Sequence, residues 1–163
     1  MNGDGGKIYQ HIDKRVRACD YLSVAQLFLQ SNFLLEKNLS FDDIKPRLLG
    51  HWGTCHGINV AYANLKTYFC PVEAEEEQTK PNNKFKEVLD NLNQRPVAKV
   101  DTSFQPRRSQ RERDNLSFIL GPGHGFPALQ ANLFVDGDLE RVDPEAVRNE
   151  SGIEYICRNF SWP

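Results

Sequence analysis

Residues 116–125 read Leu116-Ser117-Phe118-Ile119-Leu120-Gly121-Pro122-Gly123-His124-Gly125, a mostly apolar run that enters a glycine-rich turn. A short run of this kind, closed by a turn signal, predicts a buried strand. Apolar residues then follow at helical spacing, at Ala128, Leu129, Leu133 and Phe134. A strand, a tight turn and a helix form half of a βαβ unit. The sequence therefore predicts an α/β fold with a parallel sheet flanked by helices.

The turn from Gly121 to Gly125 is a candidate ligand-binding loop. Open α/β sheets bind ligands at the carboxyl ends of their strands, where this turn is expected to lie. Glycine has no Cβ, so backbone N–H groups can approach an anion closely, and the start of the next helix favours phosphate. His124 is placed to donate to a phosphate or to exchange a proton near neutral pH. The alternative is a tight turn with an exposed histidine, because one glycine-rich turn is weak evidence.

A second glycine-histidine segment lies earlier in the chain and reads Gly50-His51-Trp52-Gly53-Thr54-Cys55-His56-Gly57. A helical stripe follows it, at Ile58, Tyr62, Leu65 and Phe69. The Thr54 hydroxyl is therefore placed to cap that helix or to bind an anion. In the structural alternative, Trp52 belongs to the core and Thr54 is only a cap. A zinc site is disfavoured, because glycines break the loop between His51 and Cys55 and no carboxylate lies nearby in sequence.

Three further helices and one short helical turn are expected. The first covers about residues 16–30, with an apolar stripe of Tyr21, Val24 and Phe28 widened by Leu22, Ala25 and Leu29. Ser40 is expected to cap a short turn, and Asp143 to cap a helix with Pro144 at its first position. Residues 153–160 have the spacing of a last helix.

Residues 72–115 differ in composition from the rest. Acidic residues open this stretch, arginines close it, and prolines punctuate it. Its few apolar residues bury too little surface to offset the entropy of ordering, so a mobile insertion is predicted. The arginine-rich end could touch an anionic partner, but a solvated linker is the better interpretation.

The overall composition is that of an ordinary soluble protein. The chain has 163 residues, 39% hydrophobic and 26% charged, with a formal net charge of -2. This balance gives no indication of nucleic-acid binding, and no apolar run approaches the ~20 residues of a membrane helix. The N-terminus lacks the layout of a signal peptide, so a cytoplasmic location is expected. Four scattered cysteines are expected to be free thiols.

These segments together resemble the xylulose 5-phosphate/fructose 6-phosphate phosphoketolases, which are transketolase-like. Residues 45–54, Lys45-Pro46-Arg47-Leu48-Leu49-Gly50-His51-Trp52-Gly53-Thr54, resemble the family's first signature, and residues 121–125 resemble its second. The opening helix also has family character, and residues 160–163 resemble the lead-in to a third segment. The sequence departs from the family at His56, usually proline, and at Phe126, which replaces a small residue in many members.

The resemblance implies a function and a fold. Phosphoketolases cleave a ketose phosphate with inorganic phosphate, giving acetyl phosphate and a shorter aldose phosphate. They use thiamine diphosphate and Mg²⁺, and they are homo-oligomeric. The resemblance further implies that residues 1–163 are the N-terminal portion of the diphosphate-binding domain. It makes His51 and His124 catalytic and places Thr54, Gly121, Pro122 and Gly123 near cofactor and substrate.

The same resemblance implies that this chain contains only part of the family's active site. The family's metal-binding segment and the pyrimidine-binding domain, which supplies the activating glutamate, are not found in it. Asp136-Gly137-Asp138 lacks the glycine that follows the aspartate in such a metal-binding segment, and a hairpin-like turn is expected instead. An N-terminal fragment, inactive alone, is the first hypothesis. The alternative is a non-catalytic remnant that binds a full-length homologue or a sugar phosphate.

Overall fold

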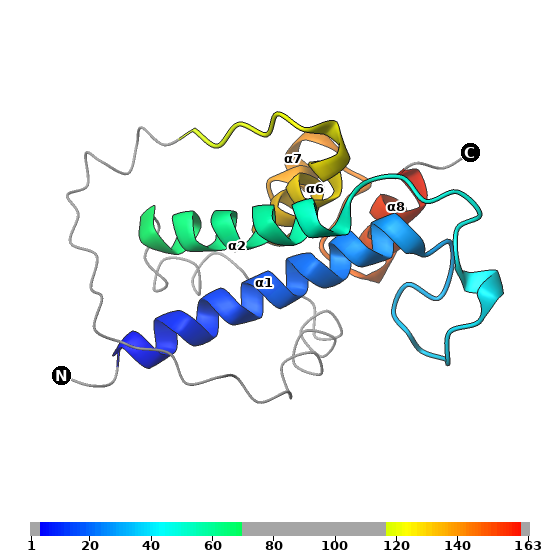
Figure 1. The fold of residues 1–163 in the computed structure, drawn as a ribbon, viewed down its shortest axis with the longest axis horizontal. Coiled ribbons are helices and arrows are strands. Elements are labelled where there is room, and N and C mark those ends of the chain that lie inside the picture. The colour runs from blue at the N-terminus through cyan, green and yellow to red at the C-terminus, as the bar shows by residue number, and fades with distance from the viewer. Residues whose placement is uncertain (1–3, 70–116, 161–163) are drawn as a thin grey trace.

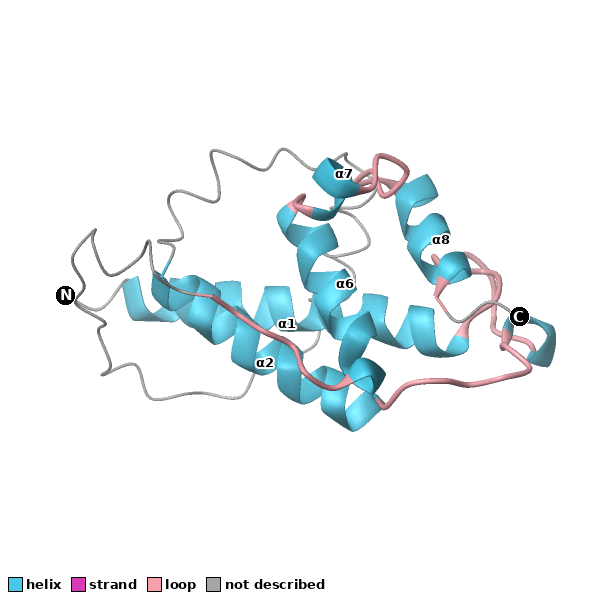
Figure 2. Ribbon diagram, turned by 90° about the horizontal axis from the view of Figure 1, so that it is seen from above, coloured by secondary structure: helices cyan, strands magenta, loops and turns pink. Residues whose placement is uncertain are grey.

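The computed structural model describes residues 4–69 and 117–160. Two long helices, α1 (Asp4–Phe28) and α2 (Trp52–Phe69), lie side by side. The shorter helices are α6 (Phe126–Asp136), α7 (Leu139–Val142) and α8 (Glu150–Asn159), and the two 3-10 turns are η1 (Phe41–Asp43) and η2 (Gly123–Gly125). α6 packs across α1 and α2, and α8 lies beside the carboxyl end of α1 (Figures 1 and 2). None of the helices in these two ranges is long and apolar enough to cross a membrane.

The predicted sheet is not formed by the residues that suggested it. Residues 117–120 have no strand partner within the described part of the chain, and they run along α2, where the Phe118 ring meets the Tyr62 ring edge-on at 5.2 Å between centroids. Ile119 is 87% exposed. The α/β sheet stays a prediction, and the predicted insertion at residues 72–115 lies outside the described residues.

The opening helix is confirmed, but it begins earlier than expected, and only part of the predicted apolar stripe is fully buried. Tyr21, Val24 and Phe28 are only half-buried. The fully buried apolar residues of α1 are Ala18, Cys19, Leu22, Ala25 and Leu27. The small residues among them let neighbouring helices approach closely. The three flanking residues of the predicted stripe, Leu22, Ala25 and Leu29, are thus buried, whereas the three at its centre are only partly buried.

The loop between α1 and α2 is held by its own hydrogen bonds. Ser40 caps η1 as predicted, in a capping box with Asp43. The Asp43 carboxylate accepts hydrogen bonds from the Ser31 hydroxyl at 2.6 Å and from the Ser40 backbone and hydroxyl, both at 2.9 Å. The chain then returns to the end of α1, where the Lys45 backbone N–H donates to Phe28 O at 2.8 Å. These bonds bring Lys45 onto the helical core, while residues 46–50 remain exposed.

The prediction of a helix capped by Asp143 is wrong. Asp143 ends α7, because its backbone N–H donates to Leu139 O at 2.8 Å. The last helix is confirmed as α8, and its cap is Asn149, whose side chain accepts from the Gly152 N–H at 3.0 Å. Glycine is required at residue 152, because a Cβ there would lie 1.8 Å from Val147 O.

Candidate active site

The two glycine-histidine loops, far apart in sequence, meet at the amino-terminal ends of α2 and α6. The His51 backbone N–H donates to the His124 carbonyl at 3.1 Å. Their imidazole rings face each other edge-on, with centroids 5.9 Å apart. Both residues are exposed. The structure thus gathers the two predicted catalytic histidines at one surface.

Two glycines of these loops allow this approach. Gly50 has a φ of +105°, and a Cβ on it would lie 2.3 Å from Leu27 Cδ2. Gly125 is buried, and a Cβ there would lie 2.5 Å from Ile58 Cδ1. Each loop is therefore packed closely against a side chain of a helix, and the positive φ of Gly50 is a conformation that favours glycine.

The predicted cap of α2 needs correction. The helix begins at Trp52, so Thr54 lies inside its first turn. The Thr54 backbone N–H donates to His51 Nδ1 at 3.0 Å, and the Cys55 N–H donates to the His51 carbonyl at 3.0 Å. His51 is therefore the residue that caps the helix. The sequence did not indicate this, because serine, threonine, aspartate and asparagine are the usual caps.

The other predicted binding residues lie beside the histidines. Gly121, Pro122 and Gly123 are exposed, and a Cβ at either glycine would have no atom within 4 Å. Pro122 is the N-cap of η2, and its carbonyl accepts from the Gly125 N–H at 3.0 Å. A ligand can therefore approach this backbone from solvent.

No metal centre is formed here by the described residues. Within residues 4–69 and 117–160, no group of three His, Cys, Asp or Glu side chains is placed to hold a metal ion. Cys55 is fully buried with its Sγ 3.9 Å from the His124 carbonyl, and burial raises the pKa of its thiol. A buried neutral thiol is a poor zinc ligand and a poor nucleophile.

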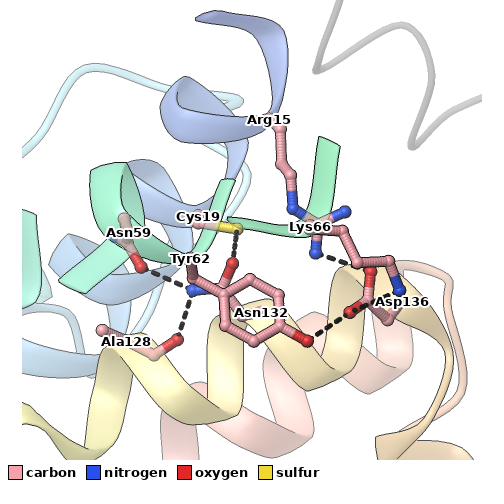
Figure 3. A network of polar contacts seen from close by, with 8 residues as sticks. All are labelled: Arg15, Cys19, Asn59, Tyr62, Lys66, Ala128, Asn132 and Asp136. Carbon is pink, nitrogen blue, oxygen red and sulfur yellow. Dashed lines mark hydrogen bonds and ion pairs between the residues drawn. The ribbon is translucent and has the colours of Figure 1, made fainter. Parts of the chain in front are cut away.

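Asp136, the last residue of α6, has a structural role. Gly137 has a φ of +78° and ends α6, so the predicted hairpin-like turn is a turn between two helices. The Asp136 carboxylate lies 2.5 Å from Arg15 Nη2, 2.8 Å from the Tyr62 hydroxyl and 3.3 Å from Lys66 Nζ (Figure 3). This carboxylate joins α1, α2 and α6.

A buried amide pair, which the sequence did not single out, joins the same helices. Asn132 donates to Asn59 Oδ1 and to Ala128 O, both at 2.8 Å, and accepts from the Cys19 thiol at 3.2 Å (Figure 3). Asn59 in turn donates to Asp20 Oδ1 at 2.9 Å. Both amides are fully buried. Their position within helical stripes is the only signal in the sequence that could have indicated them.

Lys45 is a second residue whose role the sequence concealed. Its side chain is buried, and its ammonium donates to the carbonyls of Gln26 at 2.7 Å, Cys157 at 2.8 Å and Phe160 at 2.7 Å. These carbonyls lie at the carboxyl ends of α1 and α8, which favour a cation. Burial lowers the pKa of Lys45. This lysine fixes the start of the segment that leads to His51.

Comparison with known proteins identifies the class of this chain. Residues 6–75 and 98–163 match the XFP N-terminal domain family, so the chain belongs to that family. The unmatched residues 76–97 fall within the stretch predicted as an insertion.

Named relatives agree with this family. The chain is 33% identical over 159 residues, 98% of its length, to a protein of Pseudomonas putida named "Probable phosphoketolase". It is 34% identical over 156 residues to a Rhodopseudomonas palustris protein of the same name, and 32% identical over 152 residues to "Probable phosphoketolase 2" of Rhizobium meliloti. These alignments cover 96% and 93% of the chain. The chain spans only 14% to 15% of the length of these relatives.

Proposed function

We propose that this chain contributes the histidine-bearing part of a phosphoketolase active site. The substrate would be xylulose 5-phosphate or fructose 6-phosphate, cleaved with inorganic phosphate to acetyl phosphate and an aldose phosphate. One observation carries the proposal: two exposed imidazoles, His51 and His124, meet with ring centroids 5.9 Å apart in a chain of this family.

The proposed roles follow from the chemistry of these groups. Imidazole exchanges protons near neutral pH, so His51 and His124 would hand protons to and from the oxygens of the bound sugar. The exposed backbone of residues 121–123 would face a phosphate or diphosphate group, because no Cβ blocks approach at either glycine. Thr54 lies at the same surface, three residues after His51.

The cofactor is proposed as thiamine diphosphate with Mg²⁺, and the described residues fit only part of it. When bound, thiamine diphosphate supplies the carbanion chemistry of the reaction. The open backbone at Gly121 and Gly123 suits an anionic group, but no metal-ligand cluster lies among the described residues. This part of the chain would therefore orient the substrate, while metal binding requires other residues.

A chimaeric enzyme tests the proposed roles. The segment of the Pseudomonas putida relative that aligns with this chain is replaced by this chain, and acetyl phosphate formation is measured. We expect turnover, and losses of at least 100-fold for His51→Ala and His124→Ala, on the order of the 10²–10⁴-fold typical of general acid–base groups. His56→Ala is the matched histidine control and is expected to change the rate less than threefold. Full activity of both alanine variants would overturn the assigned roles.

The isolated chain provides a second test. With thiamine diphosphate, Mg²⁺, phosphate and either ketose phosphate, the 163-residue chain is expected to form no acetyl phosphate. Turnover at the rate of an ordinary enzyme would show that the chain is sufficient for catalysis, and the proposed division of labour would then be wrong.

A second candidate function is sugar-phosphate binding without catalysis. It is favoured by the exposure of both histidines beside open glycine backbone. Calorimetry of the isolated chain with xylulose 5-phosphate would then show saturable heat that His124→Ala weakens. Absence of heat in this titration would exclude the binding module, but it would leave the catalytic proposal to the chimaera.

A further inference from the structure

The His51 ring is held over the first turn of α2 by the two residues that follow Trp52. The Thr54 backbone N–H lies 3.0 Å from His51 Nδ1, and the Thr54 Oγ1 lies 3.2 Å from the same nitrogen. The ring also rests on Gly53, where a Cβ would be only 3.2 Å from His51 Cε1. A Cβ at residue 53 would therefore require the ring to shift by a few tenths of an ångström.

A backbone N–H can only donate, and this fixes the role of the nitrogen that it meets. Neutral imidazole carries one proton, so one ring nitrogen donates and the other accepts. Because Nδ1 accepts from Thr54, the proton of the neutral ring is on Nε2. The hydroxyl of Thr54 can donate to the same Nδ1, and so it also favours a ring whose Nδ1 is unprotonated.

From this geometry we infer that Thr54 is a positioning residue that holds His51 in the Nε2–H tautomer. His51 thus presents a hydrogen-bond donor to its ligand. The chemical use of this donor, toward a hydroxyl or carbonyl oxygen of a sugar phosphate, rests on the proposed function. The tautomer itself does not rest on it. Thr54 thus acts through His51, in addition to the direct ligand contact that the family resemblance implies.

The segment Gly50-His51-Trp52-Gly53-Thr54 then has a division of tasks. Gly50 lets the chain turn against Leu27 and the His124 carbonyl. Gly53 leaves room for the ring, and Thr54 supplies the N–H that orients it. A partner that fixes the tautomer of a histidine is the arrangement by which proteins commonly set which nitrogen faces a ligand.

Nitrogen NMR of the isolated chain tests this inference without any activity. The four histidines are labelled with ¹⁵N. Spectra are recorded at pH about 8.5, roughly two units above the ordinary histidine pKa, so that the rings are neutral. The His51 signals are assigned by their loss in His51→Gln. We expect Nε2 to have the shift of a protonated nitrogen and Nδ1 that of an unprotonated acceptor. A protonated Nδ1 in His51 would overturn the inference.

Two substitutions at Thr54 separate its backbone from its hydroxyl. Thr54→Ala keeps the N–H and is expected to keep the tautomer. Thr54→Pro removes the N–H at a position in the first turn of the helix, where proline is tolerated. It should raise the Nδ1–H population of His51 at least fivefold over that of the wild type. His56 serves as internal control and should not change tautomer. An unchanged His51 population in a folded Thr54→Pro chain would contradict the positioning role.

Gly53→Ala keeps the test decisive if the proline variant does not fold. The added methyl group crowds Cε1 and should shift the His51 ring resonances, lengthen the bond to Thr54 and raise the Nδ1–H population. Identical His51 spectra in wild type and in Gly53→Ala would contradict the geometry. Because each readout is a tautomer, failure of the inference remains distinguishable from failure of the chimaera to form acetyl phosphate.

Discussion

Helices α2 and α6 use polar side chains in opposite ways along their length. In their interiors, the Asn59 and Asn132 amides are fully buried and bonded to each other. At their amino-terminal ends, His51 and His124 are exposed and are joined through a backbone hydrogen bond. The interiors of the two helices are thus joined by buried amides, while the histidine loops are joined by a backbone hydrogen bond and keep their side chains exposed. Stability and ligand chemistry should therefore respond to different substitutions.

The largest expected effect is at the buried amide. Asn132→Ala removes three hydrogen bonds, leaves the Asn59 carbonyl oxygen without that donor and opens a cavity between helices. The free energy of unfolding should fall by about 3 kcal/mol. Urea denaturation followed by circular dichroism measures it.

His124→Ala is the matched control for that experiment. Its exposed side chain should contribute less than about 0.5 kcal/mol to the free energy of unfolding. Equal losses in Asn132→Ala and His124→Ala would contradict the contrast between the two regions.

The sequence predicted the histidine loops better than it predicted the interior that supports them. Glycines beside histidines indicate an unusual backbone, and the structure gives Gly50 a φ of +105° and places Gly125 where a Cβ would lie 2.5 Å from Ile58 Cδ1. Asn59 and Asn132 could not be distinguished from surface amides, because burial depends on which face a distant helix covers. The strand predicted at residues 116–120 was inferred from apolarity alone, and a short apolar run does not by itself determine whether it pairs with another strand.

The second prediction concerns Lys45, which links the helical core to the segment leading to His51. Lys45→Met keeps much of the side-chain volume but removes the donor to three carbonyls, those of Gln26, Cys157 and Phe160. The free energy of unfolding should fall by about 2 kcal/mol, because buried carbonyls lose their partner. Lys37→Met, at a side chain 70% exposed, should change it by less than about 0.5 kcal/mol. A small effect at both lysines would show that the three contacts do not hold the segment.

A third prediction compares two glycines that flank the candidate site. Gly50→Ala places a Cβ 2.3 Å from Leu27 Cδ2 at a φ of +105°, so it should lower the free energy of unfolding by about 1.5 kcal/mol. It should also separate His51 from His124, visible as shift changes in both histidine spectra. Gly57→Ala, inside α2 with no atom within 4 Å of the new Cβ, should instead raise the free energy of unfolding by about 0.5–1 kcal/mol. Changes of the same sign in the free energy of unfolding of Gly50→Ala and Gly57→Ala would contradict the proposal that Gly50 is required by its backbone conformation.

The smallest expected effect is confined to acidic pH and concerns the loop that connects α1 to α2. Hydrogen bonds from Ser31 and Ser40 lower the pKa of Asp43 from 3.8 to about 2. Because the folded pKa lies below the unfolded one, the stabilisation is complete above the unfolded value and is lost as the pH falls through the folded value. In urea denaturation between pH 2 and pH 6, wild type and Asp43→Asn should therefore differ most at pH 6 and converge toward pH 2. Asp42→Asn, at an exposed neighbour, should follow the wild-type curve throughout. A constant difference between wild type and Asp43→Asn over this range would mean that the Asp43 charge does not stabilise the loop, and that its neutral hydrogen bonds are sufficient.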